Sequence, residues 1–142
     1  MTSRSTCDLL VLSCIDFRMP GHTKAYLDSI GHTGNYDLHT LPGASLGACC
    51  DQYPHWQQTF TDIIGLAQNL HSIKKVLIID HADCGAFHNL VRRPHDDADE
   101  LDLHQTQAQK TYKWFKSANP DLEIEIVFMA LDGKVTPMPH QP

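Results

Sequence analysis

The sequence predicts a single α/β domain over residues 1–142, built on a mostly parallel sheet of four to five strands flanked by helices. Three observations lead to this fold class. Short aliphatic runs are typical of strands that are buried on both faces, and amphipathic segments of helical period lie between them. The length of 142 residues suits one hydrophobic core. Alternating strands and helices imply crossover connections, which join parallel strands.

Four segments carry strand signals. Residues 8–15 (DLLVLSCI) form an apolar run too short for an ordinary helix, and Val76–Asp80 forms a second. Leu122–Phe128 alternates and then turns apolar, and Tyr36–Leu41 is a weaker fourth candidate. The Pro-rich tail after Gly133 is expected to be irregular.

Three helices are expected between these strands. Thr59 and Asp62 resemble a capping pair at the start of the first, whose apolar face would contain Phe60, Ile63, Ile64, Ala67 and Leu70. A second is expected at about 99–116, because acidic residues crowd its start and lysines its end. Residues 22–30 suggest a third, shorter helix.

Composition excludes several classes of protein. A formal charge of −6 with no basic stripe argues against binding to nucleic acid, whose affinity depends on cations that neutralise phosphates. No apolar stretch is long enough to cross a bilayer. Five irregularly spaced cysteines do not form the framework of a secreted disulfide protein, so reduced thiols are expected. We therefore expect a cytoplasmic protein without nucleic-acid or membrane partners.

Polar side chains follow two of the predicted strands. Cys14, Asp16 and Arg18 end the first strand, and His81 and Cys84 follow the strand at 76–80. Ligands of open parallel sheets bind outside the carboxyl ends of the strands, so these side chains should meet there. Two thiolates and one imidazole, with a fourth position left for water, are a ligand set that zinc favours. A lone cysteine at a strand end is more often a buried apolar residue, but two such clusters together favour a Zn²⁺ site.

The two clusters resemble motifs of one enzyme family. C-I-D-F-R at 14–18 resembles the C-x-D-x-R motif of β-class carbonic anhydrases, and H-A-D-C-G at 81–85 resembles their H-x-x-C-G motif. The order of the motifs matches, and each follows a strand as in that family. The segment Leu41–Ser45 also falls where the family has a loop beside its site.

The resemblance implies a role for each motif residue. Cys14, His81 and Cys84 would be the zinc ligands, and Asp16 with Arg18 would form the catalytic dyad. The implied activity is hydration of CO₂ to bicarbonate by a zinc-bound hydroxide, which Asp16 would orient while Arg18 holds the carboxylate ionised. The family also implies a homodimer or a larger homo-oligomer.

Three alternatives remain open. A hydrolase of carbonyl sulfide or carbon disulfide could use the same scaffold, because the linear electrophilic carbon of these substrates suits the same nucleophile. A non-catalytic, zinc-stabilised binding or regulatory protein is the second. In the third, Asp16 itself binds zinc and closes a structural tetrahedron with Cys14, His81 and Cys84.

Other residues depart from the family pattern or lie outside it. Phe17 replaces a residue that is often small, and we expect it to pack under the sheet. An insert at Ala48–Gln58 could cover the site. The adjacent Cys49 and Cys50 point in different directions and are expected to be incidental, and His88 is expected at the surface.

Overall fold

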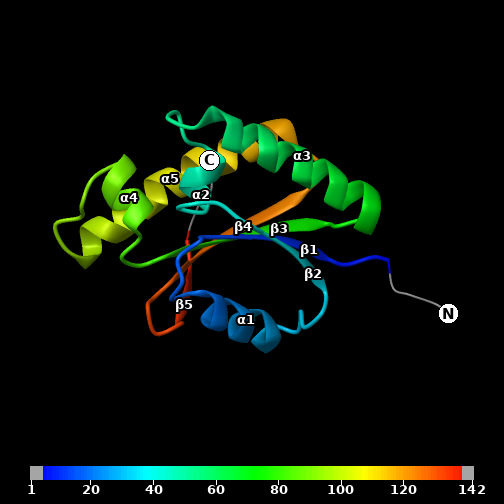
Figure 1. Ribbon diagram of the computed structural model, residues 1–142, viewed down its shortest axis with the longest axis horizontal. Helices are drawn as coiled ribbons and strands as arrows, with labels where there is room; N and C mark the ends of the chain where they lie inside the picture. Colours follow the sequence, from blue (N-terminus) through cyan, green and yellow to red (C-terminus); the bar gives the residue numbers. More distant parts are fainter. Residues whose placement is uncertain (1–4, 139–142) are drawn as a thin grey trace.

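A five-stranded sheet with helices on both faces forms the molecule (Figure 1). The computed structural model describes residues 5–138. The strands, in their order across the sheet, are β2 (Tyr36–Thr40), β1 (Leu9–Ser13), β3 (Lys75–His81), β4 (Glu123–Met129) and β5 (Val135–Pro137). The first four are parallel, and β5 runs antiparallel to β4. The predicted fold class, a single mostly parallel α/β domain, is confirmed.

The helices divide unequally between the two faces. Figure 1 shows α1 (Pro20–Ser29) on one side of the sheet and the two longest helices, with one short helix, on the other. The helices of this second side are α2 (Ser45–Ala48), α3 (Pro54–His71) and α5 (Asp97–Ala118). A short helix, α4 (Gly85–Leu90), lies beyond the carboxyl ends of the strands.

Alternate residues of each strand point to opposite faces and fill two separate cores. Leu10 and Leu12 of β1 pack in a core with α3 and α5, whereas Leu9 and Val11 pack in a core with α1. All five residues of β1 are buried, as the uninterrupted aliphatic run predicts for a central parallel strand. A central strand fixed by two cores gives its carboxyl end a well-defined position.

The predicted helices are present but differ from the structure in their bounds, and α1 covers Pro20–Ser29 where 22–30 was expected. Helix α3 begins at Pro54 rather than near Thr59, because the fixed φ of proline suits the first helical position. Thr59 is inside the helix, where its hydroxyl donates to the carbonyl of His55 at 3.0 Å instead of capping. Helix α5 starts earlier than expected, since the Asp96 carboxylate caps it by accepting from Asp99 N at 2.8 Å.

Three short elements were not predicted individually. The tail expected to be irregular contributes β5, which pairs with β4 through Val135, Thr136 and Pro137. The helices α2 and α4 span four and six residues, too few to give a periodic apolar pattern. Among the described residues, no helix is both long and apolar enough to cross a membrane.

The strand order places a crevice at the ends of β1 and β3. The chain proceeds from β1 to β2 in one direction across the sheet, and from β1 past β3 to β4 in the other. Where the direction reverses, the loops after neighbouring strands separate to opposite faces and leave a crevice for ligands. Cys14 directly follows β1, and His81 is the last residue of β3. Both therefore lie at this crevice.

Candidate metal centre

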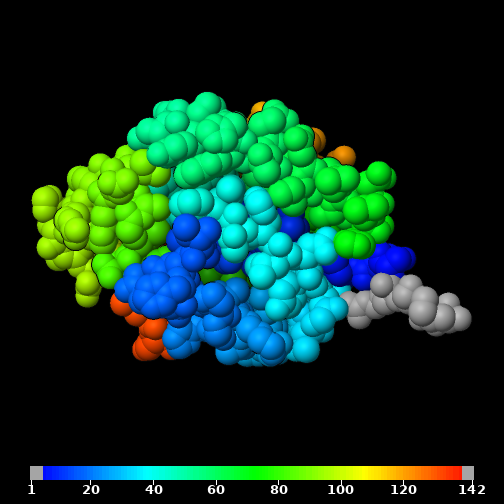
Figure 2. Space-filling model, in the orientation of Figure 1, coloured from blue at the N-terminus to red at the C-terminus, as the bar shows by residue number. Residues whose placement is uncertain are grey.

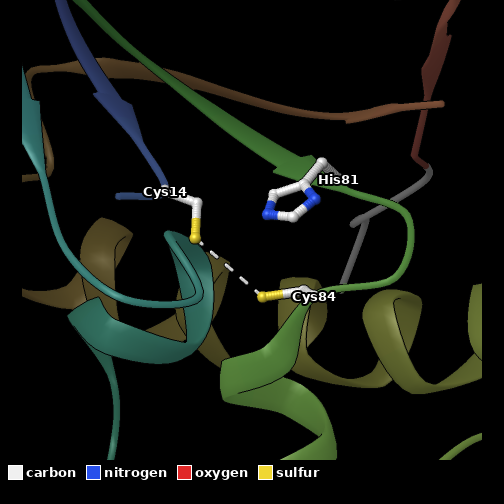
Figure 3. A group of neighbouring side chains, drawn as sticks. All are labelled: Cys14, His81 and Cys84. Carbon is white, nitrogen blue, oxygen red and sulfur yellow. Dashed lines mark hydrogen bonds between the residues drawn. The ribbon is translucent and has the colours of Figure 1, made fainter. Parts of the chain in front are cut away.

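Cys14, His81 and Cys84 converge at the carboxyl ends of β1 and β3 (Figure 3). One ligand atom from each lies within 4.8 Å of the other two, and the sulfurs of the cysteines are 4.0 Å apart. All three residues are buried, with exposures of 8%, 2% and 1%. The sequence-predicted metal ligands are thus brought together, and we call them the carboxyl-end cluster.

A hydrogen bond to the carbonyl of the next residue orients the His81 imidazole toward the sulfurs (Figure 3). Nδ1 donates to the carbonyl of Ala82 at 2.7 Å, which leaves Nε2 as the acceptor nitrogen. That Nε2 is buried and has no hydrogen-bond partner among the described residues. A buried polar atom without a partner is costly, so the chemistry of this nitrogen fits a ligand of a metal cation.

The two sulfurs also fit a divalent cation. Zinc binds thiolates at about 2.3 Å in tetrahedral geometry, which separates two sulfurs by roughly 3.8 Å. The observed separation of 4.0 Å is close to that value. The donor set of two thiols and one imidazole is therefore suited to zinc in both chemistry and spacing.

Hydrogen bonds already favour a thiolate in the cluster. The hydrogen bond from the Cys84 thiol lowers the pKa of Cys14, and His81 and the backbone N–H of Gly43 add to this against the effect of burial. The pKa of Cys84 is raised in turn, because its proton is shared with the Cys14 thiolate and because it is buried. Burial lowers the pKa of His81, but the negative charge of the adjacent Cys14 sulfur, the Ala82 carbonyl and the Asp16 carboxylate together outweigh burial and raise it. A cation would displace the shared proton.

Asp16 is held next to the cluster by Arg18. The guanidinium donates through Nε and a terminal nitrogen to both Asp16 carboxylate oxygens, at 3.0 and 2.8 Å. These bonds lower the pKa of Asp16 to about 2. The Asp16 Oδ2 atom lies 3.9 Å from His81 Nε2, so the carboxylate borders the cluster while it is engaged by arginine. Asp16 is thus paired with Arg18 beside the cluster, and the closed tetrahedron of the third alternative would require this pair to break.

A second residue fixes the position of Arg18. Asp83 accepts from Arg18 through its carboxylate at 3.0 Å and through its carbonyl at 2.9 Å. Asp83 has a left-handed φ of 55°, and its N–H donates to Glu100 on α5 at 2.8 Å. The loop between His81 and Cys84 thus places a carboxylate against Arg18.

A buried network supports the cluster from behind. The Asp80 carboxylate accepts from the backbone and hydroxyl of Ser45 at 3.0 and 2.6 Å, and from His104 Nδ1 at 2.9 Å. All three residues are almost fully buried. Asp80 precedes His81 in β3, and the Ser45 end of the network adjoins Gly43, whose N–H donates to the Cys14 sulfur at 3.4 Å. The network therefore fixes two backbone segments that hold the cluster.

Sequence reasoning missed this network, although two signals were available. Asp80 ends the apolar run of a central strand, where a carboxylate requires a partner. His104 lies three residues after Leu101 and four before Ala108, on the buried face of α5. When each of two apolar surfaces that pack together carries one polar residue, the two polar residues are expected to hydrogen-bond to each other.

A cavity of about 590 Å³ opens beside Cys14 and Asp16. Its other lining residues are mostly apolar and come from four segments: Ile15, Phe17, Pro42, Tyr53, Trp56, Gly85, Ala86, Asn89 and Leu90. Figure 2 shows the strand-end, β2–α2 and α4 segments adjoining on one face. Tyr53 and Trp56 of the insert at 48–58 line this cavity, so part of the insert does border the site. Their rings stack with centroids 4.1 Å apart.

Three secondary expectations have different outcomes. The expectation that Phe17 packs under the sheet is wrong, because the side chain is 88% exposed at the rim of the cavity. Its strand has ended, so the period-two rule no longer fixes its direction. Cys49 and Cys50 belong to no metal-ligand group among the described residues. His88 is mostly buried, with Nε2 3.7 Å from Asp83 Oδ1, so the surface expectation is also wrong.

Known proteins resemble this chain in sequence and in fold. Residues 4–138 match a family described as "Putative carbonic anhydrase". An uncharacterized protein of Rickettsia bellii is 34% identical over 128 residues, which cover 89% of this chain and 78% of the relative. An uncharacterized protein of Rickettsia conorii is also 34% identical, over 69% of its length. The β-carbonic anhydrase CafA of Aspergillus fumigatus superposes with a TM-score of 0.65 at 14% identity, covering 97% of this chain and 78% of that one.

Proposed function

The chain belongs to the family described as "Putative carbonic anhydrase", and from this premise we propose that it hydrates CO₂ to bicarbonate with a zinc ion bound by Cys14, His81 and Cys84. The observation that carries the proposal is the buried His81 Nε2, which lacks a hydrogen-bond partner among the described residues and faces two sulfurs. Zinc bound there would supply a Lewis acid that lowers the pKa of water to produce a nucleophile near neutral pH.

The neighbouring residues supply orientation. Asp16 would accept a hydrogen bond from the reacting water and align its lone pair with the carbon of CO₂. Arg18 holds that carboxylate ionised and at a fixed position through two hydrogen bonds, so Asp16 remains an acceptor throughout the neutral range. The thiolates contribute two negative charges that oppose those of zinc, so orientation by Asp16 matters more here than beside three neutral imidazoles.

The apolar cavity supports a small, uncharged substrate. Ile15, Pro42 and Leu90 are among its lining residues, and apolar walls suit CO₂ better than a charged ligand. The same lining favours a second candidate, hydrolysis of carbonyl sulfide or carbon disulfide, because these molecules are also linear and apolar. We therefore retain that activity as the alternative.

A direct comparison of three substrates tests the proposal. Zinc-loaded protein should hydrate CO₂ in a stopped-flow pH-indicator assay, with release of sulfide from carbonyl sulfide and carbon disulfide slower at equal concentration. Faster release of sulfide would favour the hydrolase. Zinc retention without turnover of any of the three would leave a non-catalytic zinc protein and would contradict the proposal.

We also propose a homodimer or larger homo-oligomer. Phe17 and Ile15 expose apolar side chains at the cavity rim, and such residues are common where subunits meet. Analytical ultracentrifugation should give at least twice the mass of the 142-residue chain, and Phe17→Asp should lower it. A monomer at all accessible concentrations would contradict this part of the proposal.

A further inference from the structure

A second group of side chains that can bind a metal lies at the opposite end of the parallel strands from the carboxyl-end cluster. Cys7 precedes β1, Asp37 is the second residue of β2, and His71 is the last residue of α3. One ligand atom from each of these residues lies within 4.8 Å of the other two. We call this group the amino-end cluster, because it lies at the amino ends of the strands.

Backbone contacts fix the three residues relative to one another. Cys7 N donates to the carbonyl of His71 at 3.0 Å, which ties the segment before β1 to the end of α3. Asp37 is opposite Leu10 in the parallel pairing of β1 and β2. The cluster is therefore assembled by the fold and not by the side chains alone.

The side chains are directed at a common space. His71 Nδ1 donates to Asp37 Oδ2 at 2.7 Å. Both side chains and Cys7 line an open cavity of about 330 Å³, together with Ser5, Thr6, Gly34 and Tyr36. The side chains of His71 and Asp37 are 40% and 30% exposed. A hydrated ion can thus reach the cluster, and water can complete its coordination.

We propose that Cys7, Asp37 and His71 form a second zinc-binding site. A thiolate and a carboxylate balance the charge of a divalent cation, and a neutral imidazole completes a mixed S, O, N set that zinc accepts. Calcium and magnesium, which prefer oxygen ligands, are disfavoured by the sulfur and the nitrogen. The site is distinct from the carboxyl-end cluster and does not depend on the proposed activity.

The geometry needs only a small adjustment to bind the ion. Ligand atoms about 2.0–2.1 Å from zinc in tetrahedral geometry are roughly 3.4 Å apart. The nitrogen and oxygen that now share a proton at 2.7 Å must therefore separate by roughly 0.7 Å while zinc replaces that proton. Cys7 Sγ gives up a weak 3.6 Å hydrogen bond to the carbonyl of Leu9.

Zinc bound there would join the segment before β1, the edge strand β2 and the end of α3. An ion that binds the folded chain and not the unfolded chain shifts the equilibrium toward folding. The expected role is stabilisation of the edge where β1 and β2 begin.

Metal stoichiometry of the full-length chain tests the proposal. Protein equilibrated with excess zinc and then freed of unbound metal should lose one zinc equivalent per chain in Cys7→Ser and in His71→Asn relative to wild type. Asp37→Asn, which keeps the shape of the side chain, should weaken the same equivalent about tenfold. With cobalt as the probe, Cys7→Ser should lower the sulfur-to-cobalt absorption in proportion.

His55→Asn is the matched control, because His55 is also on α3 but lies in its first turn, away from the cluster. It should keep the wild-type content. The measured quantity is the difference between wild type and variants, so it does not depend on whether the carboxyl-end cluster binds zinc. Equal metal content in wild type, Cys7→Ser and His71→Asn would overturn the proposal.

Discussion

The two metal-ligand clusters lie at opposite ends of the parallel strands. They differ less in their ligands than in their surroundings. The carboxyl-end cluster is buried, and its Cys14 sulfur accepts from Gly43 while Asp16 and Arg18 border it. The amino-end cluster is half-exposed, and its Asp37–His71 pair faces an open cavity. Both contain side chains of the kind that bind metal ions, but only one is surrounded by groups that could act on a substrate.

The difference shows what a catalytic centre requires beyond ligands. Exclusion of water strengthens every electrostatic interaction in a site, and hydrogen-bonded neighbours fix ligands and the reacting water in position. Asp80 and Ser45 supply this support at the carboxyl-end cluster. At the amino-end cluster, backbone hydrogen bonds fix the positions of the ligand residues. They do not place a further side chain that could orient a reacting water.

The largest effect is expected from removing one sulfur of the carboxyl-end cluster. Cys84→Ser replaces a soft thiolate with a hydroxyl, so that zinc should be lost from this cluster and CO₂ hydration should fall by at least about 1,000-fold. Cys7→Ser makes the same chemical change at the amino-end cluster and should leave hydration within about twofold of wild type. Metal analysis and stopped-flow hydration measure both. Equal loss of activity in the two variants would contradict the assignment of roles.

The buried network should matter next for stability. Asp80→Ala leaves Ser45 and His104 buried without their acceptor, at a cost of roughly 3 kcal/mol in the free energy of unfolding. It should also weaken zinc binding by about 10–100-fold, because the strand that carries His81 loses its anchor. Urea denaturation with and without zinc measures the two effects. Asp37→Ala, which removes a half-exposed carboxylate, is the control, and an equal loss of stability there would contradict the distinction.

Asp16 tests orientation without loss of metal. Asp16→Asn keeps the shape of the side chain but replaces one acceptor oxygen with a donor, so turnover should fall by about 100-fold while one zinc per carboxyl-end cluster remains. The measurement is kcat for CO₂ hydration alongside metal content. Unchanged turnover would remove Asp16 from the proposed mechanism.

The smallest expected effect is on the pKa of Asp16 and on stability at acidic pH when Arg18 is replaced. The hydrogen bond from Arg18 holds the pKa of Asp16 at about 2, below its ordinary value of 3.8. A lowered pKa means that the pair stabilises the folded chain above about pH 4 and that this contribution is lost as the pH falls toward 2. In Arg18→Met, the pKa should return toward 3.8. Carboxyl NMR titration over the pH range in which the protein stays folded should show the difference, and identical curves would contradict it.

The sequence predicted the parts of the fold that depend on local pattern. The aliphatic run at 8–15 gave β1, and the polar residues at strand ends gave the ligands, because both signals lie within a few adjacent positions. The start of α3 was misplaced, since Thr59 was interpreted as a cap when Pro54 was the stronger signal. Two local signals for the start of one helix can thus lie close together in the sequence, and the weaker one can be chosen.

Features that join distant positions could not be predicted from local patterns. His104 and Ser45 are 24 and 35 residues from Asp80, and only the packing of α2 against β3 and of α5 against α2 and β4 brings them together. Cys7 and His71 meet through a backbone bond between the segment before β1 and the end of α3. Phe17 follows the end of its strand, where no periodicity fixes the direction of a side chain.

An anomalous difference map from a crystal of zinc-loaded protein, measured on both sides of the zinc absorption edge, tests the central claim most directly. We expect a strong zinc-specific peak within bonding distance of Cys14 Sγ, His81 Nε2 and Cys84 Sγ, with Asp16 still paired to Arg18. A map from fully loaded protein with no peak among these three atoms would contradict the claim.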